Sequence, residues 1–407
     1  MSQMDSPRGW WNVGAAFIGL SLSYAMFTVF VFGTLVKPLQ AEFGWGRAEM
    51  SFALTVTNIT VVFGSPTIGL LVDRLGVKRL LIPSVALMGI AVAAMSLLNS
   101  NIWFYYLGFF GITFLGLGTL PLSYSRILIG WFERRRGLAL GVALSGFGVG
   151  GALAPEVAAT MTELYGWRSV YQLFAVLVIF LALPVSLFVL KEAPNGPGAS
   201  PQAAVEAEAG LNASAAARTR DYWLILASFL LVGIGITSVL SHMVPMLMDR
   251  GMSFSAAARC MSTLAVALIF GRMLAGYLMD YFFAPFVTAA FIVFGLAGGI
   301  VLLALGAVGT WAFVAAALVG LATGSEISEI AYIVGRYFGQ RAFGLIYGIM
   351  FGGFQLGSAV AAPMMGYYHD SHGDYIGALW GITALVLLGA VLIALLSPYP
   401  DKTRESS

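Results

Sequence analysis

The sequence has few of the side chains on which most soluble, metal-binding and nucleic-acid-binding proteins depend. Only 10% of the 407 residues are charged, whereas an ordinary soluble domain has about 25%. The single cysteine, Cys260, excludes a disulfide within the chain, and three histidines leave little for a zinc site. With 21 basic and 19 acidic residues, the chain has no basic field for nucleic acid. We therefore expect no metal, no cofactor and no nucleic-acid partner.

Hydrophobic residues, by contrast, make up 59% of the chain, which is more than a globule of this size can hide from water. The lipid bilayer is the remaining solvent, and a helix needs roughly 20 apolar residues to cross it. Twelve apolar runs approach or exceed this length: 12–36, 49–72, 80–98, 102–132, 137–162, 168–190, 222–248, 254–279, 284–306, 310–334, 343–367 and 375–397. The first is too long for a signal-peptide core, so we expect it to be retained. The sequence thus predicts an all-α membrane protein with twelve transmembrane helices.

A polar segment divides these runs into two sets of six. Residues 191–220 are rich in proline, alanine, asparagine and glutamate, which is typical of a solvated linker. We therefore expect one six-helix bundle at 1–190 and another at 221–407. If both termini are cytoplasmic, most lysines and arginines outside the runs lie on the cytoplasmic side, as the positive-inside rule requires. We expect a monomeric functional unit in a bacterial-type inner membrane.

The two halves of the chain resemble each other. Residues 63–73 and 270–280 share Phe, two Gly, Leu and Asp at an offset of 207 positions, and residues 137–141 match 344–348 at the same offset. Parallel halves of six helices, with binding near the membrane midplane between them, are typical of alternating-access transporters. The repeat therefore predicts two pseudo-symmetric six-helix bundles.

The segment GLLVDRLGVKR, residues 69–79, resembles the loop signature of the major facilitator superfamily, in which an aspartate and basic residues hold neighbouring helix ends together. The resemblance implies a structural gating motif made of Gly69, Asp73, Arg74, Gly76 and Arg79, with Asp280 as the counterpart in the second half. Narrower similarity to the monocarboxylate transporter and oxalate/formate antiporter branches lies in residues 23–25, 37–45, 131–141, 166–168 and 242–251.

Arg272 is the strongest candidate for a functional residue. A charge in the middle of a membrane helix costs roughly 2.5–3.5 kcal/mol on insertion scales. The repeat places Ser65 at the equivalent position, so the shared helix packing does not require an arginine. A guanidinium is a permanently charged, planar fork for a carboxylate, and in the resembling families an arginine of the eighth helix binds the substrate carboxylate. The alternative is a buried ion pair with Glu326 or Glu329.

Glu326, Glu329 and Tyr332 follow one another at three-residue steps in the tenth run and share one gradually drifting helix face. Buried carboxyl groups can carry protons, so either acid is a candidate for coupling transport to the proton gradient. Similarity to related sequences favours Glu329. The alternative is that the acids neutralise Arg272 or Arg126 without titrating. Tyr332 offers a hydroxyl donor to the substrate.

Four further side chains are weaker candidates for the substrate site. Tyr124 in the fourth run offers a hydroxyl, and His242 in the seventh can donate to an anion or change its charge near neutral pH. Asn58 and Thr28 offer polar groups in the second and first runs. Each of the four can equally well pack or bond to a neighbouring helix without contacting a substrate.

Three differences from the resembling families narrow the range of possible substrates. Met350 lies near the position at which oxalate exchangers have a second cation. Thr28 lies near the position of a first-helix lysine in animal monocarboxylate transporters, and Leu268 occupies the position of their eighth-helix aspartate. One arginine without a second fixed cation suits a monoanion, because a second buried carboxylate would lack a partner.

These observations predict a secondary transporter that carries a small monocarboxylate such as lactate or pyruvate together with a proton. The alternative is an organic-anion antiporter of the oxalate/formate type. The sequence offers no nucleophile–base pair and no metal cluster, so we do not expect an enzyme.

Overall fold

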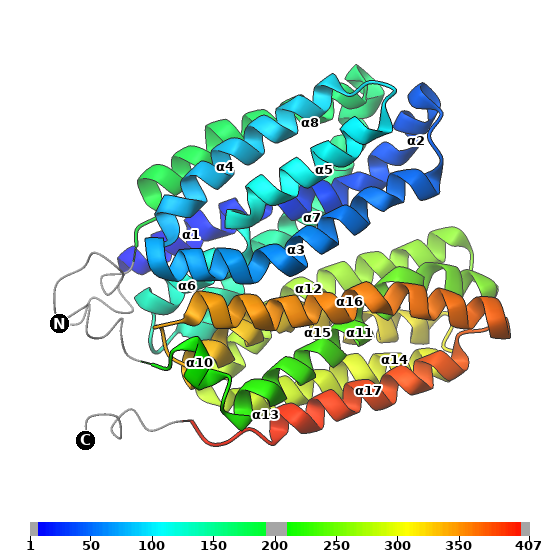
Figure 1. Cartoon of the computed structure of the whole chain (residues 1–407). Coiled ribbons are helices and arrows are strands. Elements are labelled where there is room, and N and C mark those ends of the chain that lie inside the picture. Colours follow the sequence, from blue (N-terminus) through cyan, green and yellow to red (C-terminus); the bar gives the residue numbers. More distant parts are fainter. Residues whose placement is uncertain (1–6, 193–209, 400–407) are drawn as a thin grey trace, which may run out of the picture. The chain divides into compact units, whose positions relative to one another are not determined.

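The computed structural model describes residues 7–192 and 210–399, and within these ranges the chain is built of helices (Figure 1). In the described ranges, eleven helices are long and apolar enough to cross a membrane, and there are up to twelve if the bent pair Arg8–Thr28 and Phe32–Phe43 is one span. The prediction of an all-α membrane protein is thereby confirmed. Residues 193–209, the middle of the expected linker, lie outside the described ranges.

The chain divides into two compact units. Unit 1 takes in the described residues of Met1–Glu133 and Val142–Ala207, and unit 2 takes in Arg134–Gly141 with the described residues of Glu208–Ser407. The beginning of one long helix, α7, therefore clusters with unit 2 although the rest of that helix belongs to unit 1.

The described part of unit 1 contains seven α-helices, most of an eighth (α7), and five short π-helical or 3-10 helical segments. They are α1 (Pro7–Ser21), η1 (Met26–Val31), α2 (Phe32–Phe43), α3 (Arg47–Leu75), α4 (Val77–Ala94), η2 (Met95–Leu97), α5 (Ile102–Gly116), η3 (Leu117–Thr119), α6 (Pro121–Trp131), α7 (Arg136–Tyr165), α8 (Trp167–Leu177), η4 (Val178–Ala182) and η5 (Val185–Val189).

Two of the expected runs in unit 1 are not straight helices. The first widens into the π-helical turn η1 and bends by about 40° between its two parts, since a π-turn displaces the backbone hydrogen-bond ladder. The fourth is interrupted at η3, because Pro121 has no N–H to continue the ladder. Within the break, the Gly118 N–H donates to Ser84 Oγ at 2.9 Å, which satisfies one freed backbone group.

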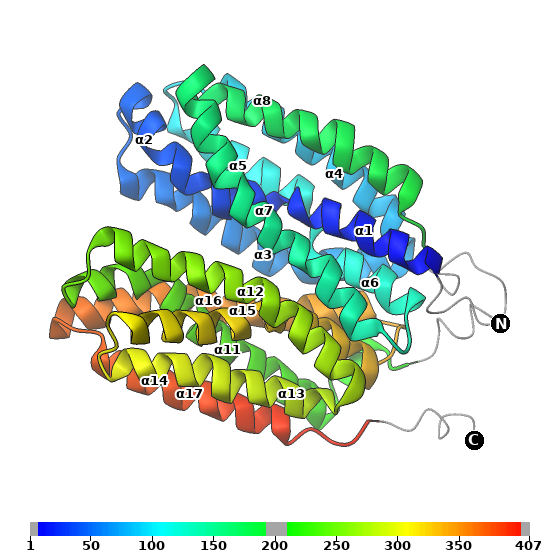
Figure 2. The same cartoon turned by 180° about the vertical axis from the view of Figure 1, so that it is seen from behind.

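Unit 2 contains the second set of helices. They are α10 (Ala213–Ala216), α11 (Arg220–Asp249), α12 (Phe254–Tyr281), α13 (Ala284–Ala290), η6 (Phe291–Ala297), α14 (Gly298–Ala304), α15 (Thr310–Tyr337), α16 (Phe343–His372) and α17 (Ile376–Ala394). Figures 1 and 2 show α12 beside α15, with α13, α14 and α17 grouped together on another side of this unit.

Two long helices of unit 2, α11 and α12, begin at polar caps. The Thr219 hydroxyl accepts a hydrogen bond from the Tyr222 N–H at the start of α11, and the Ser253 hydroxyl accepts one from the Ala256 N–H at the start of α12. Such caps satisfy backbone donors that have no partner within the helix.

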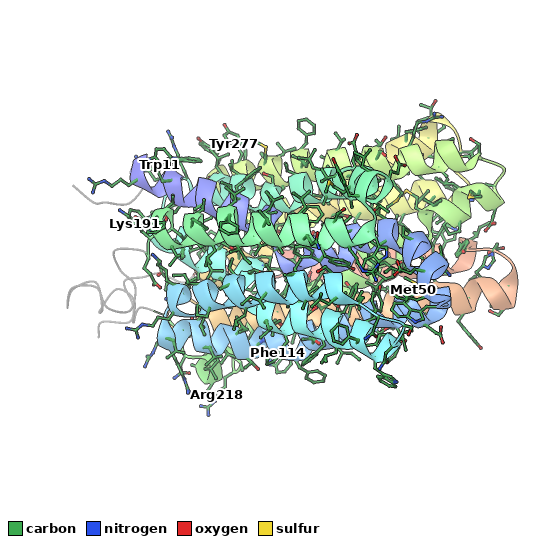
Figure 3. The ribbon with its side chains drawn as sticks, turned by 90° about the horizontal axis from the view of Figure 1, so that it is seen from above. Trp11, Met50, Phe114, Lys191, Arg218 and Tyr277 are labelled. Carbon is green, nitrogen blue, oxygen red and sulfur yellow. The ribbon has the colours of Figure 1, made fainter. Side chains whose placement is uncertain are left out.

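Large hydrophobic side chains cover much of the outside of the helices. Trp11 is 71% exposed and Phe114 is 54% exposed, and Figure 3 shows Phe114 directed away from the ribbon. Water would make such a surface costly, whereas lipid tails cover it without penalty. The exposed surface thus agrees with a bilayer environment.

Candidate functional site

The helices α12 and α15 approach each other at backbone distance. A Cβ atom added to Gly271 would clash with the Leu321 carbonyl oxygen, and one added to Gly320 would clash with the Leu264 carbonyl oxygen. A Cβ atom at Gly324 would clash with the carbonyl oxygen of Leu268. Small residues spaced four apart allow membrane helices to pack this closely. We call these three glycines the glycine seam.

The glycine seam positions Arg272. This side chain is only 3% exposed, and its Nε donates a hydrogen bond of 2.8 Å to the Gly324 carbonyl oxygen. Because α15 comes so close, the guanidinium can reach a backbone carbonyl in the middle of the neighbouring helix. Its electrostatic neighbours in unit 2 are Glu326 and Tyr347. The seam therefore fixes a cation at the level of the acids of α15.

Glu326 lies on α15 two residues after the carbonyl that binds Arg272. Its side chain is 6% exposed, and its Oε2 atom has no hydrogen-bond partner among the described residues. A buried carboxylate without full hydrogen bonding depends on a nearby cation, and Arg272 is that neighbour. The Arg272 guanidinium can therefore pair either with Glu326 or with another anion. Glu326, in turn, can be neutralised either by Arg272 or by a proton.

Glu329 lies one turn further along α15 and has different surroundings. It is 2% exposed, and its carboxyl group faces the hydroxyls of Ser325, on the same helix, and Thr288, on α13. Its only titratable neighbour among the described residues is Glu326. The two acids thus share a helix but belong to different polar clusters.

Tyr332 is placed away from Arg272, at the end of unit 2 where Asp280 lies. Its charged and titratable neighbours are Asp280, Arg336, Tyr399 and Arg136. Six residues of helix separate Tyr332 from Glu326, which is about 9 Å along the axis. The structure therefore separates Tyr332, which joins another cluster, from Glu326 and Arg272.

Asp280 caps the beginning of α7. Its two carboxylate oxygens accept hydrogen bonds from the N–H groups of Gly137 at 2.7 Å and Leu138 at 2.9 Å. A carboxylate at a helix N-terminus satisfies free donors and interacts favourably with the helix dipole. The close approach requires glycine, since a Cβ atom at Gly137 would clash with the Gly276 carbonyl.

His242 lies in a third cluster of unit 2. It is about two turns from the end of α11, whereas Arg272 is about five turns from the start of α12, so the two differ in level by roughly 15 Å. The His242 ring lies 5.5 Å from the ring of Tyr375, which is stacked on His369 at 4.5 Å. The structure thus does not bring His242 to Arg272.

The remaining substrate candidates belong to unit 1. Tyr124 is 1% exposed and points between Gly19 of α1 and Ser186 of η5. The Thr28 hydroxyl donates to the Tyr24 carbonyl at 3.2 Å, and Asn58 is exposed on α3. Tyr124 and Thr28 are therefore packed inside this unit, and only Asn58 presents its side chain at a surface of the helices.

The gating motif occupies the end of α3 and the start of α4. Asp73 pairs with the buried Arg126 of α6, with 3.8 Å between Oδ1 and Nε. Gly76 has a φ angle of 84°, which other residues rarely adopt, and Gly69 is buried. The two basic side chains of the motif are exposed, namely Arg74 and Arg79.

Sequence reasoning missed several residues of the unit 2 clusters. Gly324, Ser325 and Thr288 are common residue types in membrane helices, and no sequence signal singles them out. Tyr347 is different, because the internal repeat places Leu140 at the equivalent position. Like the arginine at position 272, it departs from the repeat, and a comparison of the two halves could have found it.

The family model of the Major Facilitator Superfamily matches the sequence over residues 16–326. The chain belongs to this superfamily. Mouse monocarboxylate transporter 11 is 24% identical over 409 residues, which cover 95% of this chain and 87% of the mouse protein. Human monocarboxylate transporter 11 is 25% identical over 95% of this chain and 83% of the human protein.

Solved structures of the superfamily show the same fold. The Escherichia coli fucose:proton symporter FucP superposes with a TM-score of 0.71 at 18% identity, covering 94% of this chain and 98% of FucP. The proton:xylose symporter XylE gives a TM-score of 0.74 at 16% identity, covering 97% of each chain. The expected superfamily and fold are thereby confirmed.

Proposed function

We propose that this protein is a secondary transporter that carries a small monocarboxylate, such as lactate or pyruvate, together with a proton by alternating access. The observation that carries the proposal is the buried pair of Arg272 and Glu326 next to the glycine seam. An arginine held at its Nε by a backbone carbonyl keeps its orientation, which a carboxylate-binding fork requires.

Charge balance links the proton to the anion. The ionised pair of Arg272 and Glu326 buries no net charge. When Glu326 takes up a proton, the guanidinium loses its counter-ion, and an unpaired buried charge is costly. A substrate carboxylate restores the balance by taking the place of Glu326. Proton uptake and anion binding therefore favour each other, which is the thermodynamic requirement for symport.

The same balance favours a monoanion over a dianion. Exchange of one carboxylate for another leaves the net charge of the cluster unchanged, whereas a dianion adds a negative charge that needs its own cation. Met350 of α16 is fully buried. It lies near the position at which the resembling oxalate exchangers have a lysine. We infer that the substrate carries one carboxylate.

The names of the similar proteins support this proposal. The two curated relatives are named monocarboxylate transporters, and the two solved structures are those of proton symporters. For the setting, we propose a multi-pass protein of the plasma membrane with cytoplasmic termini, bundles at 1–190 and 221–407 joined by residues 191–220, and a monomeric functional unit.

Uptake into liposomes tests the proposal. Purified protein should accumulate labelled lactate when the outside is made acidic. Arg272→Gln should abolish uptake, and Arg272→Lys should raise the KM for lactate because lysine keeps the charge but loses the fork. Arg259→Gln is the matched control, since this arginine of the same helix is exposed, and it should transport as the wild type does.

Two outcomes would contradict the proposal. Unchanged lactate affinity in Arg272→Gln would remove the arginine from the binding site. A wild-type protein that ignores the pH gradient but exchanges external lactate for internal oxalate or formate would be an organic-anion antiporter.

A further inference from the structure

The last described residues of the chain cross one end of unit 2. Residues 396–399 follow α17 as an irregular segment, which is red in Figures 1 and 2 and lies beside α13. The N–H and the hydroxyl of Ser397 both donate to Asp221 Oδ1 at 3.3 Å, at the start of α11. The Tyr337 hydroxyl, at the end of α15, donates to the Ser397 carbonyl oxygen at 2.5 Å. We call residues 396–399 the C-terminal strap, since they tie α17 to α11 and α15.

Tyr399, the last residue of the strap, is held from several sides. Its hydroxyl accepts a hydrogen bond of 2.9 Å from the N–H of Ala284, the first residue of α13. Its ring meets the rings of Phe283 and Tyr337 edge-on, with 4.8 Å and 5.4 Å between centroids. The Arg336 guanidinium lies 4.5 Å from the centre of the same ring. Edge-to-face and cation–π contacts are both favourable, so Tyr399 anchors the strap.

The anchor of Tyr399 is the connection between α12 and α13. The residue before α13 is Phe283, whose side chain makes no capping hydrogen bond. Tyr399 supplies the acceptor that a polar capping residue would otherwise offer to the start of the helix. Only residues 282–283 separate α13 from the end of α12. Because this connection is so short, fixing Ala284 also fixes the last turn of α12.

The last turn of α12 carries Asp280, whose contacts demand an accurate position. Its two oxygens accept from the N–H groups of Gly137 and Leu138 at 2.7 Å and 2.9 Å, at the start of α7. One turn earlier, a Cβ atom added to Gly276 would clash with the Gly137 carbonyl oxygen. A shift of this end of α12 therefore either breaks the cap or causes a clash. Most of α7 belongs to unit 1, although its first residues belong to unit 2.

We propose that the C-terminal strap is a conformational lock, in which Tyr399 is a positioning residue that keeps Asp280 on the start of α7. While Tyr399 is seated, unit 2 holds the first turn of α7, and when Tyr399 leaves, that turn is released. Alternating access requires a transporter to make and break such contacts in turn. The strap thus biases the protein towards the conformation described above. This consequence for transport rests on the proposed function, whereas the lock itself does not.

Amide hydrogen exchange, resolved to single residues in the purified protein, tests the lock. The N–H groups of Gly137 and Leu138 lie in the first turn of α7 and have no acceptor within that helix, so their protection depends on Asp280. Tyr399→Phe keeps the ring but removes the acceptor of the Ala284 N–H. We expect exchange at Gly137 and Leu138 to become about five- to tenfold faster, which is the effect of one net hydrogen bond.

Two controls separate the lock from a general loss of stability. The Ala139 N–H donates to the Arg135 carbonyl oxygen of its own helix at 2.9 Å, so its exchange should stay at the wild-type rate in Tyr399→Phe. Tyr281→Phe is the matched variant, because this tyrosine also lies at the end of α12 but is 70% exposed. It should leave the exchange of Gly137 unchanged.

Tyr337→Phe tests the strap even if the variant of Tyr399 does not fold. It removes the hydroxyl that donates to the Ser397 carbonyl oxygen, so it should also speed exchange at the start of α7. Wild-type exchange at Gly137 in both variants would overturn the proposal. Faster exchange at Ala284 alone, with Gly137 still protected, would mean that the strap only caps α13, and the lock would be refuted.

A double-mutant cycle in thermal unfolding tests whether Tyr399 acts through Asp280. If it does, the decrease in the thermal midpoint caused by Tyr399→Phe should be smaller in the Asp280→Asn background than in the wild type. Two decreases that simply add would show independent contributions and would refute the positioning role. Neither experiment uses lactate, so failure of the proposed function would leave both results unaffected.

Discussion

Replacing Gly324 by alanine should both destabilise unit 2 and weaken substrate binding. The added Cβ atom would clash with the Leu268 carbonyl oxygen and lie 2.9 Å from the backbone nitrogen of Arg272, where ordinary contacts begin at about 3.4 Å. Backbone atoms cannot rotate away as a flexible side chain can, so α12 and α15 must separate. The hydrogen bond of 2.8 Å from Arg272 to Gly324 is then stretched or broken.

The magnitude follows from three contributions. Overpacking costs about 1–3 kcal/mol, and the loss of a buried hydrogen bond costs about 1–3 kcal/mol. Alanine gains about 1 kcal/mol over glycine in helix propensity. The net loss in the free energy of unfolding is therefore about 3 kcal/mol. For a unit of this size, 1 kcal/mol shifts the thermal midpoint by about 2–4 °C, so we expect a decrease of about 6–12 °C.

The assay combines thermal unfolding in detergent with lactate uptake in liposomes. Gly298→Ala is the matched control, because a Cβ atom there would lie 3.6 Å from its nearest neighbour, the Val293 carbonyl oxygen. That variant should be as stable as the wild type or more so, and fully active. If Gly324→Ala unfolds and transports like Gly298→Ala, the seam does not position Arg272 and the reasoning is refuted.

Three smaller effects on the thermal midpoint in detergent follow from single contacts. Asp280→Asn should lower stability by about 1 kcal/mol, because the cap of α7 loses its charge; an unchanged midpoint would show that the cap is not stabilising. Glu192→Ala should cost a similar amount, about 1 kcal/mol, by removing the bond of 2.9 Å to the Lys78 N–H at the start of α4. The ion pair of Arg168 with Glu42 is 43% and 38% exposed, so its part of the loss in Arg168→Gln should be only about 0.5 kcal/mol and should vanish in 1 M salt; the loss of the bond to the Leu98 carbonyl and of the contact with the Trp167 ring should remain. A loss that is the same with and without salt would contradict this last estimate.

The helices could be predicted from the sequence because each apolar run had the length of a membrane span. The bend of the first span was not predictable in the same way. Hydropathy stays high through Met26–Val31, where the ladder widens into a π-turn. The apolar fourth run likewise gave little sign of the break at η3, although Pro121 marks it. Composition determines that a segment enters the bilayer, whereas hydrogen bonding within it determines its shape.

The candidate site was predictable in part. Arg272 and Glu326 stood out because a charge in a membrane helix needs a reason, and the structure makes them neighbours. Tyr332 shares their helix face but not their level, because a spacing of six residues moves a side chain about 9 Å along the axis. The prediction that His242 shares a site with Arg272 is wrong for the same reason, because the two side chains lie at different levels along their helices. Periodicity gives the face of a helix, and only the packing of helices against one another gives the level.

The partners of Glu329 lay beyond sequence reasoning altogether. Thr288 lies forty-one positions earlier in the chain and meets Glu329 only because α13 packs against α15. Ser325 lies on the same helix as Glu329, and its hydroxyl also donates to the Ala322 carbonyl oxygen at 2.8 Å. Chemistry of this kind depends on which donors are already engaged, and a sequence does not contain that information.

The central claim, that one proton accompanies one monoanion, is tested most directly by uptake under separate control of pH gradient and membrane potential. Liposomes whose membrane potential is clamped with potassium and valinomycin should accumulate lactate in proportion to the pH gradient. Accumulation should not respond to voltage, because the transported proton and monoanion together carry no net charge. A carrier that moved one net charge would change its accumulation about 50-fold per 100 mV, since that potential is worth about 2.3 kcal/mol per charge. Accumulation that follows voltage and ignores the pH gradient would contradict the account.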